Sequence, residues 1–329
     1  MTDPVEAMIN LYKTWPKQLI KGYKEGVKAS HVIDGIDNIV FCGMGGSGAT
    51  GDFVRAYLNE EQGIPSFVVK EFKLPRWVGK DTLVFGISYS GNTIETLTCV
   101  REAIDRGARV VTVSSGGSLQ GLARSNGLQH VVLDKGYYPR TALAQMIGAV
   151  LGVLSDLANG VTMSLANEIA ERLSKVKPGS LRDVAYRLRN SDPIVIVTGS
   201  GLEPLARRFR SELSENSKVI AKEEVYPESG HNDIVSWQAS HNADLGFIII
   251  NVKGEKPYSI IMDTLKEIYS RHGVVEELVL EPASRLSLLI EGSLMAGYLS
   301  VYLAGYRNVD PRDTNIINAY KEATRKALA

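Results

Sequence analysis

Short apolar segments alternate with helical patterns along the first half of the chain. Runs rich in β-branched and aromatic residues predict buried strands at 38–42, 66–69, 82–87, 109–113 and 131–133. Between the first two runs, Phe53, Ala56 and Tyr57 recur at helical spacing. Strands that alternate with helices and are apolar throughout are typical of a parallel sheet covered on both faces.

The same pattern starts again in the second half of the chain. A strand predicted at 193–198 runs into a Gly/Ser turn at Gly199, as the strand at 38–42 runs into Gly43. Later runs at 245–250 and 277–280 mirror the third and fourth strands of the first half. We therefore predict an α/β protein with two similar domains, 1–155 and 156–329, each a parallel sheet flanked by helices. A last amphipathic helix is predicted over 316–328.

Charge and composition narrow the classes of partner and compartment. The 37 Lys and Arg balance 37 Asp and Glu, and a nucleic-acid-binding protein usually has a basic surplus, so we predict no nucleic-acid partner. Cys42 and Cys99 form no disulfide framework and no zinc-ligand pattern. The N-terminus has no signal-peptide pattern, and no apolar run approaches about 18 residues. We predict a cytoplasmic protein that does not enter a membrane.

The turn after the first strand has two interpretations. The segment 43–48 matches the G-x-G-x-x-G fingerprint of dinucleotide-binding proteins, and Glu71 follows at a distance that suits a ribose-binding acid. One alternative is therefore an NAD-dependent dehydrogenase. The match is weak evidence, because any anion-binding loop at a helix start needs glycines that expose backbone N–H groups.

A second polar loop favours a phosphate group as the ligand. The segment 88–93, Ser-Tyr-Ser-Gly-Asn-Thr, lies between a buried strand and a helix start, where hydroxyls and amides can hold phosphate. The alternative is an ordinary helix cap by Asn92 or Thr93. A cap needs only one polar side chain, however, and this loop offers four.

Together these two loops resemble the sugar isomerase (SIS) domain, which binds phosphosugars. The segments 139–140, 214–218, 230–237 and 310–321 narrow the resemblance to the bifunctional phosphoglucose/phosphomannose isomerases of archaeal type. The resemblance covers both domains in order. It implies two SIS domains, each with a five-stranded parallel sheet, that assemble as a homodimer. It also implies a cofactor-free enzyme that interconverts glucose 6-phosphate and mannose 6-phosphate with fructose 6-phosphate through an enediol.

The resemblance implies roles for individual residues, with no metal among them. The residues that would bind the phosphosugar are Gly46, Ser47, Ser88, Ser90, Thr93 and Thr314. The catalytic residues would be Arg140, Glu215, His231 and Lys321, with His231 reaching the active site from the other subunit.

The chemistry of these residue types agrees with the implied reaction. Proton transfer through an enediol needs a base, and Glu215 follows the helical stripe of Leu205, Phe209 and Leu213. An imidazole exchanges protons near neutral pH, which suits ring opening, and His231 stands in a polar loop.

Two aromatic residues and a proline precede Arg140 and would hold its guanidinium near a developing enediolate. Without the resemblance, Glu215 and Lys321 would be interpreted as solvated surface groups, and Arg140 equally well as a surface or interface residue. The remaining histidines, His31, His130, His241 and His272, are isolated and are predicted to be surface or packing residues without metal-ligand spacing.

A noncatalytic regulator that binds phosphosugars is the other alternative, because SIS domains also serve as ligand-binding modules. Against it, the sequence has no basic helix-turn-helix segment, and both halves carry the enzyme-like pattern.

Overall fold

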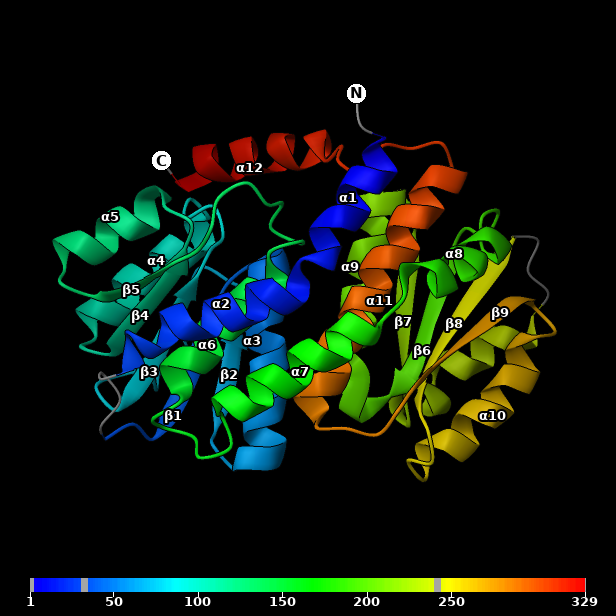
Figure 1. Cartoon of the computed structure of the whole chain (residues 1–329), viewed down its shortest axis with the longest axis horizontal. Coiled ribbons are helices and arrows are strands. Elements are labelled where there is room, and N and C mark those ends of the chain that lie inside the picture. Colours follow the sequence, from blue (N-terminus) through cyan, green and yellow to red (C-terminus); the bar gives the residue numbers. More distant parts are fainter. Residues whose placement is uncertain (1–2, 31–34, 240–243, 329) are drawn as a thin grey trace. The chain divides into compact units, whose positions relative to one another are not determined.

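Figure 1 shows the computed structural model, which describes residues 3–30, 35–239 and 244–328. The chain forms two compact units. One unit contains Lys13–Lys175, and the other combines Met1–Tyr12 with Val176–Ala329.

A five-stranded parallel sheet forms the centre of the Lys13–Lys175 unit. Its strands are β1 (Asn38–Cys42), β2 (Ser66–Val69), β3 (Thr82–Ile87), β4 (Arg109–Ser114) and β5 (Gln129–Val132), in the order β2-β1-β3-β4-β5. All five strands were predicted within two residues of these bounds. Every residue of β3 is buried, as expected for a parallel strand with helices on both faces.

The helices of this unit are α2 (Trp15–Val27), α3 (Gly45–Tyr57), α4 (Ile94–Asp105), α5 (Gly117–Ser125), α6 (Leu143–Leu154) and α7 (Met163–Lys175). All residues of α6 are buried. It packs against α2 through a glycine pair on each helix, Gly22 and Gly26 against Gly148 and Gly152. A Cβ atom at Gly148 would lie 2.1 Å from the carbonyl oxygen of Leu19, so the two backbones are in direct contact.

The second unit contains a parallel sheet with strands β6 (Ile194–Gly199), β7 (Ala221–Tyr226), β8 (Leu245–Val252) and β9 (Gly273–Leu280). Their order, β7-β6-β8-β9, repeats the order β2-β1-β3-β4 and confirms the predicted internal repeat. The helices are α8 (Pro178–Arg187), α9 (Glu203–Glu212), α10 (Tyr258–Tyr269), α11 (Arg285–Tyr306), α12 (Asn315–Leu328) and most of α1 (Pro4–Lys13).

The expectation of five strands in each sheet is wrong for the second sheet, which has four within the described residues. Only residues 281–284 separate β9 from α11. This connection is too short for a helix and strand that would correspond to α5 and β5, and the chain enters the long helix α11 instead.

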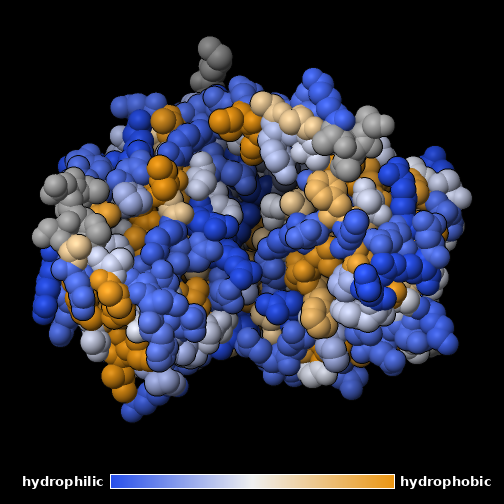
Figure 2. Space-filling view, turned by 180° about the vertical axis from the view of Figure 1, so that it is seen from behind, coloured by the Kyte–Doolittle hydropathy of each residue, from blue (hydrophilic) through white to orange (hydrophobic). Residues whose placement is uncertain are grey.

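Within the described residues, α11 is the one helix long and apolar enough to cross a membrane by length and composition. However, 83% of its apolar window is buried inside the protein, as in the core helix of a folded domain. The face shown in Figure 2 is mainly hydrophilic, with hydrophobic residues in separate patches.

The two domains also share a π-helical turn at the end of corresponding helices, α3 and α9. Each helix continues into a π-helical turn, Leu58–Gln62 after α3 and Leu213–Ser217 after α9. Each turn ends at a residue in the left-handed region, Gly63 with φ 65° and Lys218 with φ 58°. π-Helical turns occur often at functional sites, and Glu215 lies in the second one.

The glycine contacts between α2 and α6 lead to a stability prediction. Gly148→Ala should destabilise the protein by about 3 kcal/mol, because backbone rather than a flexible side chain blocks the added methyl group. Gly121→Ala on α5 is the matched control, since no atom lies within 4 Å of its Cβ position, and it should stabilise by about 0.5 kcal/mol. Denaturant unfolding measures both changes. Equal stability of the two variants would contradict the close helix contact.

Candidate active site

The carboxyl ends of β1 and β3 are adjacent at the point where the strand order of the first sheet reverses. In sheets of this order, ligands bind at this switch point. The segment 43–48 follows β1, and the segment 88–93 follows β3. The topology therefore brings together the two loops that the sequence analysis identified.

The first of these segments is not the turn that the sequence predicts. Gly43 and Met44 alone connect β1 to α3, and the helix begins at Gly45, whose φ of 53° lies in the left-handed region. Glycine adopts this conformation without steric cost, so the chain passes from strand to helix in two residues. Gly46 and Ser47 consequently lie in the first turn of α3.

Buried hydroxyl groups connect the two segments. The Ser47 hydroxyl oxygen accepts a hydrogen bond from the backbone N–H of Tyr89 at 3.1 Å. The Ser88 hydroxyl donates to the Thr93 hydroxyl at 2.9 Å. Ser47 is 5% exposed and Ser88 is 1% exposed, whereas Ser90 is exposed. The structure thus brings Ser47, Ser88 and Thr93 together.

Neither helix at this point has a side-chain cap. Thr93 is the N-cap residue of α4 and Met44 that of α3, and neither side chain accepts a hydrogen bond from its helix. The Asn92 side-chain oxygen instead accepts from the N–H and the hydroxyl of Ser118, both at 3.0 Å. The ordinary capping role that we considered for Asn92 or Thr93 is therefore wrong. In α3 the N–H groups of Ser47 and Gly48 donate to the Met44 carbonyl oxygen, which leaves those of Gly45 and Gly46 without a carbonyl partner within the helix and suited to bind an anion.

A glycine pair that the sequence analysis missed shapes the second loop. A Cβ atom at Gly91 (φ 70°) would lie 1.8 Å from the carbonyl oxygen of Gly116, and one at Gly117 (φ 70°) would lie 2.4 Å from that of Ser90. The Leu119 N–H also donates to the Gly91 carbonyl at 2.8 Å. The segment after β4 therefore fixes the loop after β3. The run Ser-Ser-Gly-Gly-Ser at 114–118 was the available signal.

Arg140 lies beside the start of α3. A Cβ atom at Gly46 would lie 2.9 Å from the Pro139 carbonyl oxygen and 3.4 Å from the Arg140 Cα, so the backbones are in contact. The Arg140 side chain is buried, and its Cζ lies 5.0 Å from the centre of the Tyr138 ring. The prediction that an aromatic residue holds this guanidinium is confirmed for Tyr138. The surface alternative for Arg140 is wrong, because the residue is 2% exposed within the chain.

In the second unit, Glu215 is half-buried in the π-helical turn Leu213–Ser217. The Lys218 ammonium group donates to the carbonyl oxygen of Glu215 and to that of Asp310, each at 2.8 Å. Thr314 is half-buried and directly precedes α12, on which Lys321 is exposed. The structure therefore connects the turn that carries Glu215 to the segment that leads to Thr314.

His231 is exposed at the end of the 3₁₀ turn Glu228–His231, and a second 3₁₀ turn, Asp233–Gln238, follows it. The indole N–H of Trp237 donates to the Glu224 carboxylate at 3.2 Å, and the Tyr269 hydroxyl donates to the same carboxylate at 2.5 Å. Glu224 is fully buried. This buried carboxylate, which the sequence analysis did not identify, anchors the loop that carries His231.

Two aromatic hydroxyls near Glu224 stay protonated. Burial raises the pKa of Tyr226 to about 12, and burial together with the Glu224 charge raises the pKa of Tyr269 well above its usual value. The hydroxyls of the two tyrosines are 2.7 Å apart. Tyr269 therefore serves as a donor to Glu224 at neutral pH.

Of the other histidines, His130 and His272 lie within the described residues. His130 is half-buried, with Nδ1 2.7 Å from the Thr112 hydroxyl, and burial lowers its pKa. The packing role predicted for His130 is confirmed. The His272 ring lies 5.7 Å from that of Trp237. His31 and His241 lie outside the described residues.

Family models match both halves of the chain. The SIS domain model matches residues 33–130, and the model of the bacterial phospho-glucose isomerase C-terminal SIS domain matches residues 180–323. The fold is therefore two SIS domains. Neither match includes residues 131–179, so the predicted boundary between residues 155 and 156 stays a prediction.

Full-length relatives identify the family. The bifunctional phosphoglucose/phosphomannose isomerase of Aeropyrum pernix is 33% identical to this chain over 98% of the chain and 99% of the relative. That of Aquifex aeolicus is 33% identical over 88% of the chain and 90% of the relative. The D-glucosamine-6-phosphate 4-epimerase of Sulfolobus acidocaldarius is 28% identical to this chain over 98% of the chain and 99% of the relative. Identity at this level over nearly the whole length shows that the chain belongs to the family of bifunctional phosphoglucose/phosphomannose isomerases.

Proposed function

We propose that the chain is a cofactor-independent isomerase that interconverts glucose 6-phosphate and mannose 6-phosphate with fructose 6-phosphate. The observation that carries the proposal is the pair of uncapped helix starts, α3 and α4, beside the buried hydroxyls of Ser47 and Ser88 and the half-buried hydroxyl of Thr93. An NAD-dependent dehydrogenase and a noncatalytic regulator receive less support, because the relatives named as isomerases match over nearly the whole chain.

The phosphate group binds at the first switch point. The first N–H groups of α3 and α4, among them those of Gly45 and Gly46, would donate to the phosphate, and both helix dipoles favour negative charge there. The hydroxyls of Ser47, Ser88, Ser90 and Thr93 supply further donors, and Gly46 lets the backbone approach closely. Hydroxyls and amides can hold a phosphate without a surplus of basic residues.

The reaction begins with ring opening, because the aldoses exist mainly as cyclic forms. His231 and Lys321 transfer the protons between O1 and O5 in this step. Both side chains are exposed within the described chain, which supports their access to a ligand.

Glu215 then removes the proton from C2 of the open aldose. The electron pair of the C–H bond forms the double bond between C1 and C2, and the C1 carbonyl oxygen takes up a proton. Return of a proton from Glu215 to C1, with loss of the O2 proton, gives the ketose. The Arg140 guanidinium stabilises the negative charge that develops on the enediolate oxygens.

Acting on both epimers at C2 requires that the base reach either face of that carbon. Rotation about the C2–C3 bond achieves this, and Thr314 is the side chain assigned to that part of the sugar. The active enzyme is a cytoplasmic homodimer in which each His231 acts in the active site of the partner subunit. The exposure of His231 on its loop supports this arrangement.

Glu215→Gln tests the assigned base. The variant should lose at least 100-fold in kcat in both directions, while KM changes by less than about three-fold, because the amide cannot accept the C2 proton. Coupled assays with each of the three sugar phosphates measure this loss. Glu203→Gln on α9 is the matched control, since its carboxylate pairs with exposed Arg207, and it should keep wild-type rates. Activity of Glu215→Gln within a few-fold of wild type would make the assignment wrong.

The same assay separates this proposal from its alternatives. Glucosamine 6-phosphate is included as a further substrate because one relative is named a 4-epimerase of that compound. A regulator would bind fructose 6-phosphate without turnover, and a dehydrogenase would require NAD.

The combined change Ser90→Ala and Thr93→Ala tests the phosphate site. KM for fructose 6-phosphate should rise at least ten-fold, because two hydroxyl donors to a charged group are lost. The free energy of unfolding should fall by about 1 to 2 kcal/mol, because Thr93→Ala leaves the buried Ser88 hydroxyl without its acceptor. Ser125→Ala on α5, which removes an exposed hydroxyl bonded to its own helix, should leave KM unchanged. Initial-rate kinetics give both values. An unchanged KM in the double variant would refute the phosphate assignment.

A further inference from the structure

The two π-helical turns of the repeat end differently. The turn after α3 ends at Gly63 and the turn after α9 ends at Lys218, with nearly the same left-handed φ angle. Glycine takes this conformation without cost, whereas a residue with a Cβ atom is strained in it. Among the described residues, Lys218 and Asn308 are the non-glycine residues with positive φ. Asparagine tolerates this region well, so Lys218 is the unusual residue.

The Lys218 side chain makes contacts that glycine cannot supply. Its ammonium group donates to three main-chain carbonyl oxygens, those of Glu215 at 2.8 Å, Asn216 at 3.3 Å and Asp310 at 2.8 Å. The first two belong to the π-helical turn, and the third belongs to the segment that leads to Thr314. One lysine therefore bridges two segments that are about ninety residues apart in the sequence.

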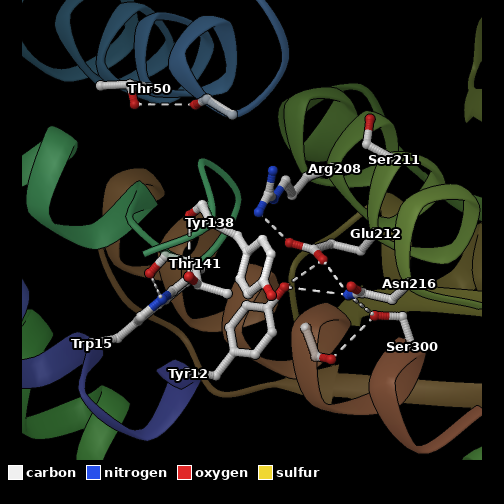
Figure 3. Close-up of polar contacts among 12 residues, drawn as sticks. Tyr12, Trp15, Thr50, Tyr138, Thr141, Arg208, Ser211, Glu212, Asn216 and Ser300 are labelled. Atoms are coloured by element: carbon white, nitrogen blue, oxygen red, sulfur yellow. Dashed lines mark hydrogen bonds and ion pairs between the residues drawn. The ribbon is translucent and has the colours of Figure 1, made fainter. Parts of the chain in front are cut away.

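Each of the two segments also makes contacts that do not involve Lys218. The Asn216 side-chain amide donates to Glu212 at 2.8 Å and to Ser300 at 2.9 Å, and the Tyr12 hydroxyl donates to Glu212 at 2.6 Å (Figure 3). Arg208 forms a fully buried ion pair with the same Glu212. These contacts fix the inner side of the turn.

On the side of the C-terminal segment, the Arg312 guanidinium binds the Asp310 carboxylate at 2.7 Å. The Asp310 carbonyl oxygen thus belongs to a locally ordered turn when it accepts from Lys218. The lysine connects two parts that are each already ordered.

We propose that Lys218 is a positioning residue for the isomerase reaction: its ammonium group fixes the turn that carries Glu215 against the segment that carries Thr314. This inference rests on the proposed function. The proposed role explains why a lysine occupies the position that corresponds to Gly63 in the first domain. The three hydrogen bonds of the lysine side chain offset the strain of its left-handed backbone. Lys218 acts through Glu215 and Thr314 and does not itself touch the sugar.

Lys218→Gly separates a positioning role from a purely structural one. The change removes the bridge and also relieves the backbone strain, so the midpoint of thermal unfolding should be equal to or higher than that of wild type. The value of kcat with both aldose phosphates should fall about 10- to 100-fold, because a small displacement of a base has this effect. KM should change less than three-fold, since the phosphate group binds to other residues.

Two controls accompany this variant. Asn308→Gly relieves the same kind of backbone strain and removes none of the Lys218 contacts, so its kcat should equal that of wild type. Lys218→Cys alkylated with 2-bromoethylamine restores a side chain of lysine length with an ammonium group, and should recover kcat to within about three-fold of wild type. Cys42 and Cys99 are buried, so the alkylation is selective for position 218.

A readout that does not depend on activity is amide hydrogen exchange in residues 213–217 and 310–314. Exchange in both segments should be faster in Lys218→Gly and return to the wild-type rate in the alkylated cysteine variant. Wild-type kcat and exchange in Lys218→Gly would overturn the inference. So would a kcat loss with a lowered unfolding midpoint and no recovery on alkylation, which indicates a structural role. If wild type itself turns over none of the three sugar phosphates, the proposed function fails first, and this inference fails with it.

Discussion

The parallel arrangement of the strands is the constraint on which the rest of the structure depends. Parallel neighbours need crossover helices, and the order β2-β1-β3 sends the connections after β1 and β3 to opposite faces of the sheet. Two helices therefore start side by side at one edge, and the first two N–H groups of each have no carbonyl partner within their own helix. Ser47 and the Ser88–Thr93 pair occupy the space between these starts. The topology thus favours the anion site that we propose here, and the loop residues supply its hydroxyl groups.

The sequence alone predicts the parts of this arrangement that depend on local pattern. Continuous apolar runs locate the strands, and the repeated strand and turn reveal the second domain. Tertiary contacts were out of reach, because they join residues far apart in the chain. The contact of Gly148 with the Leu19 backbone and that of Gly91 with Gly116 are of this kind. The start of α3 was also misplaced, because glycines usually indicate a turn and here form the first turn of a helix.

In the candidate site, the residue types alone predicted a role where several polar residues are adjacent in the sequence. They predicted no role for a single charged residue, whose function depends on residues far away in the chain. The hydroxyl-rich loop after β3 indicated a phosphate on its own. Glu215 and Lys321 are ordinary surface residues by pattern, and only the family resemblance selected them. The role that we propose for Lys218 rests on its left-handed backbone and its contact with Asp310, and neither is visible in a sequence.

The second sheet has the same parallel strand order, but different residues line its switch point. At the corresponding switch point, a Cβ atom at Gly199 would lie 2.6 Å from the Tyr258 ring, and one at Gly201 would lie 2.7 Å from the Arg285 guanidinium. Tyr258 and Arg285 line a pocket at this loop, and Arg285 forms an ion pair with Glu255 at 3.1 Å. An aromatic ring and an ion pair therefore line this loop, where the first unit has hydroxyl groups. The two switch points of the repeat thus differ in their linings, and in the second unit Glu215 lies at the other end of α9, in the π-helical turn that follows the helix.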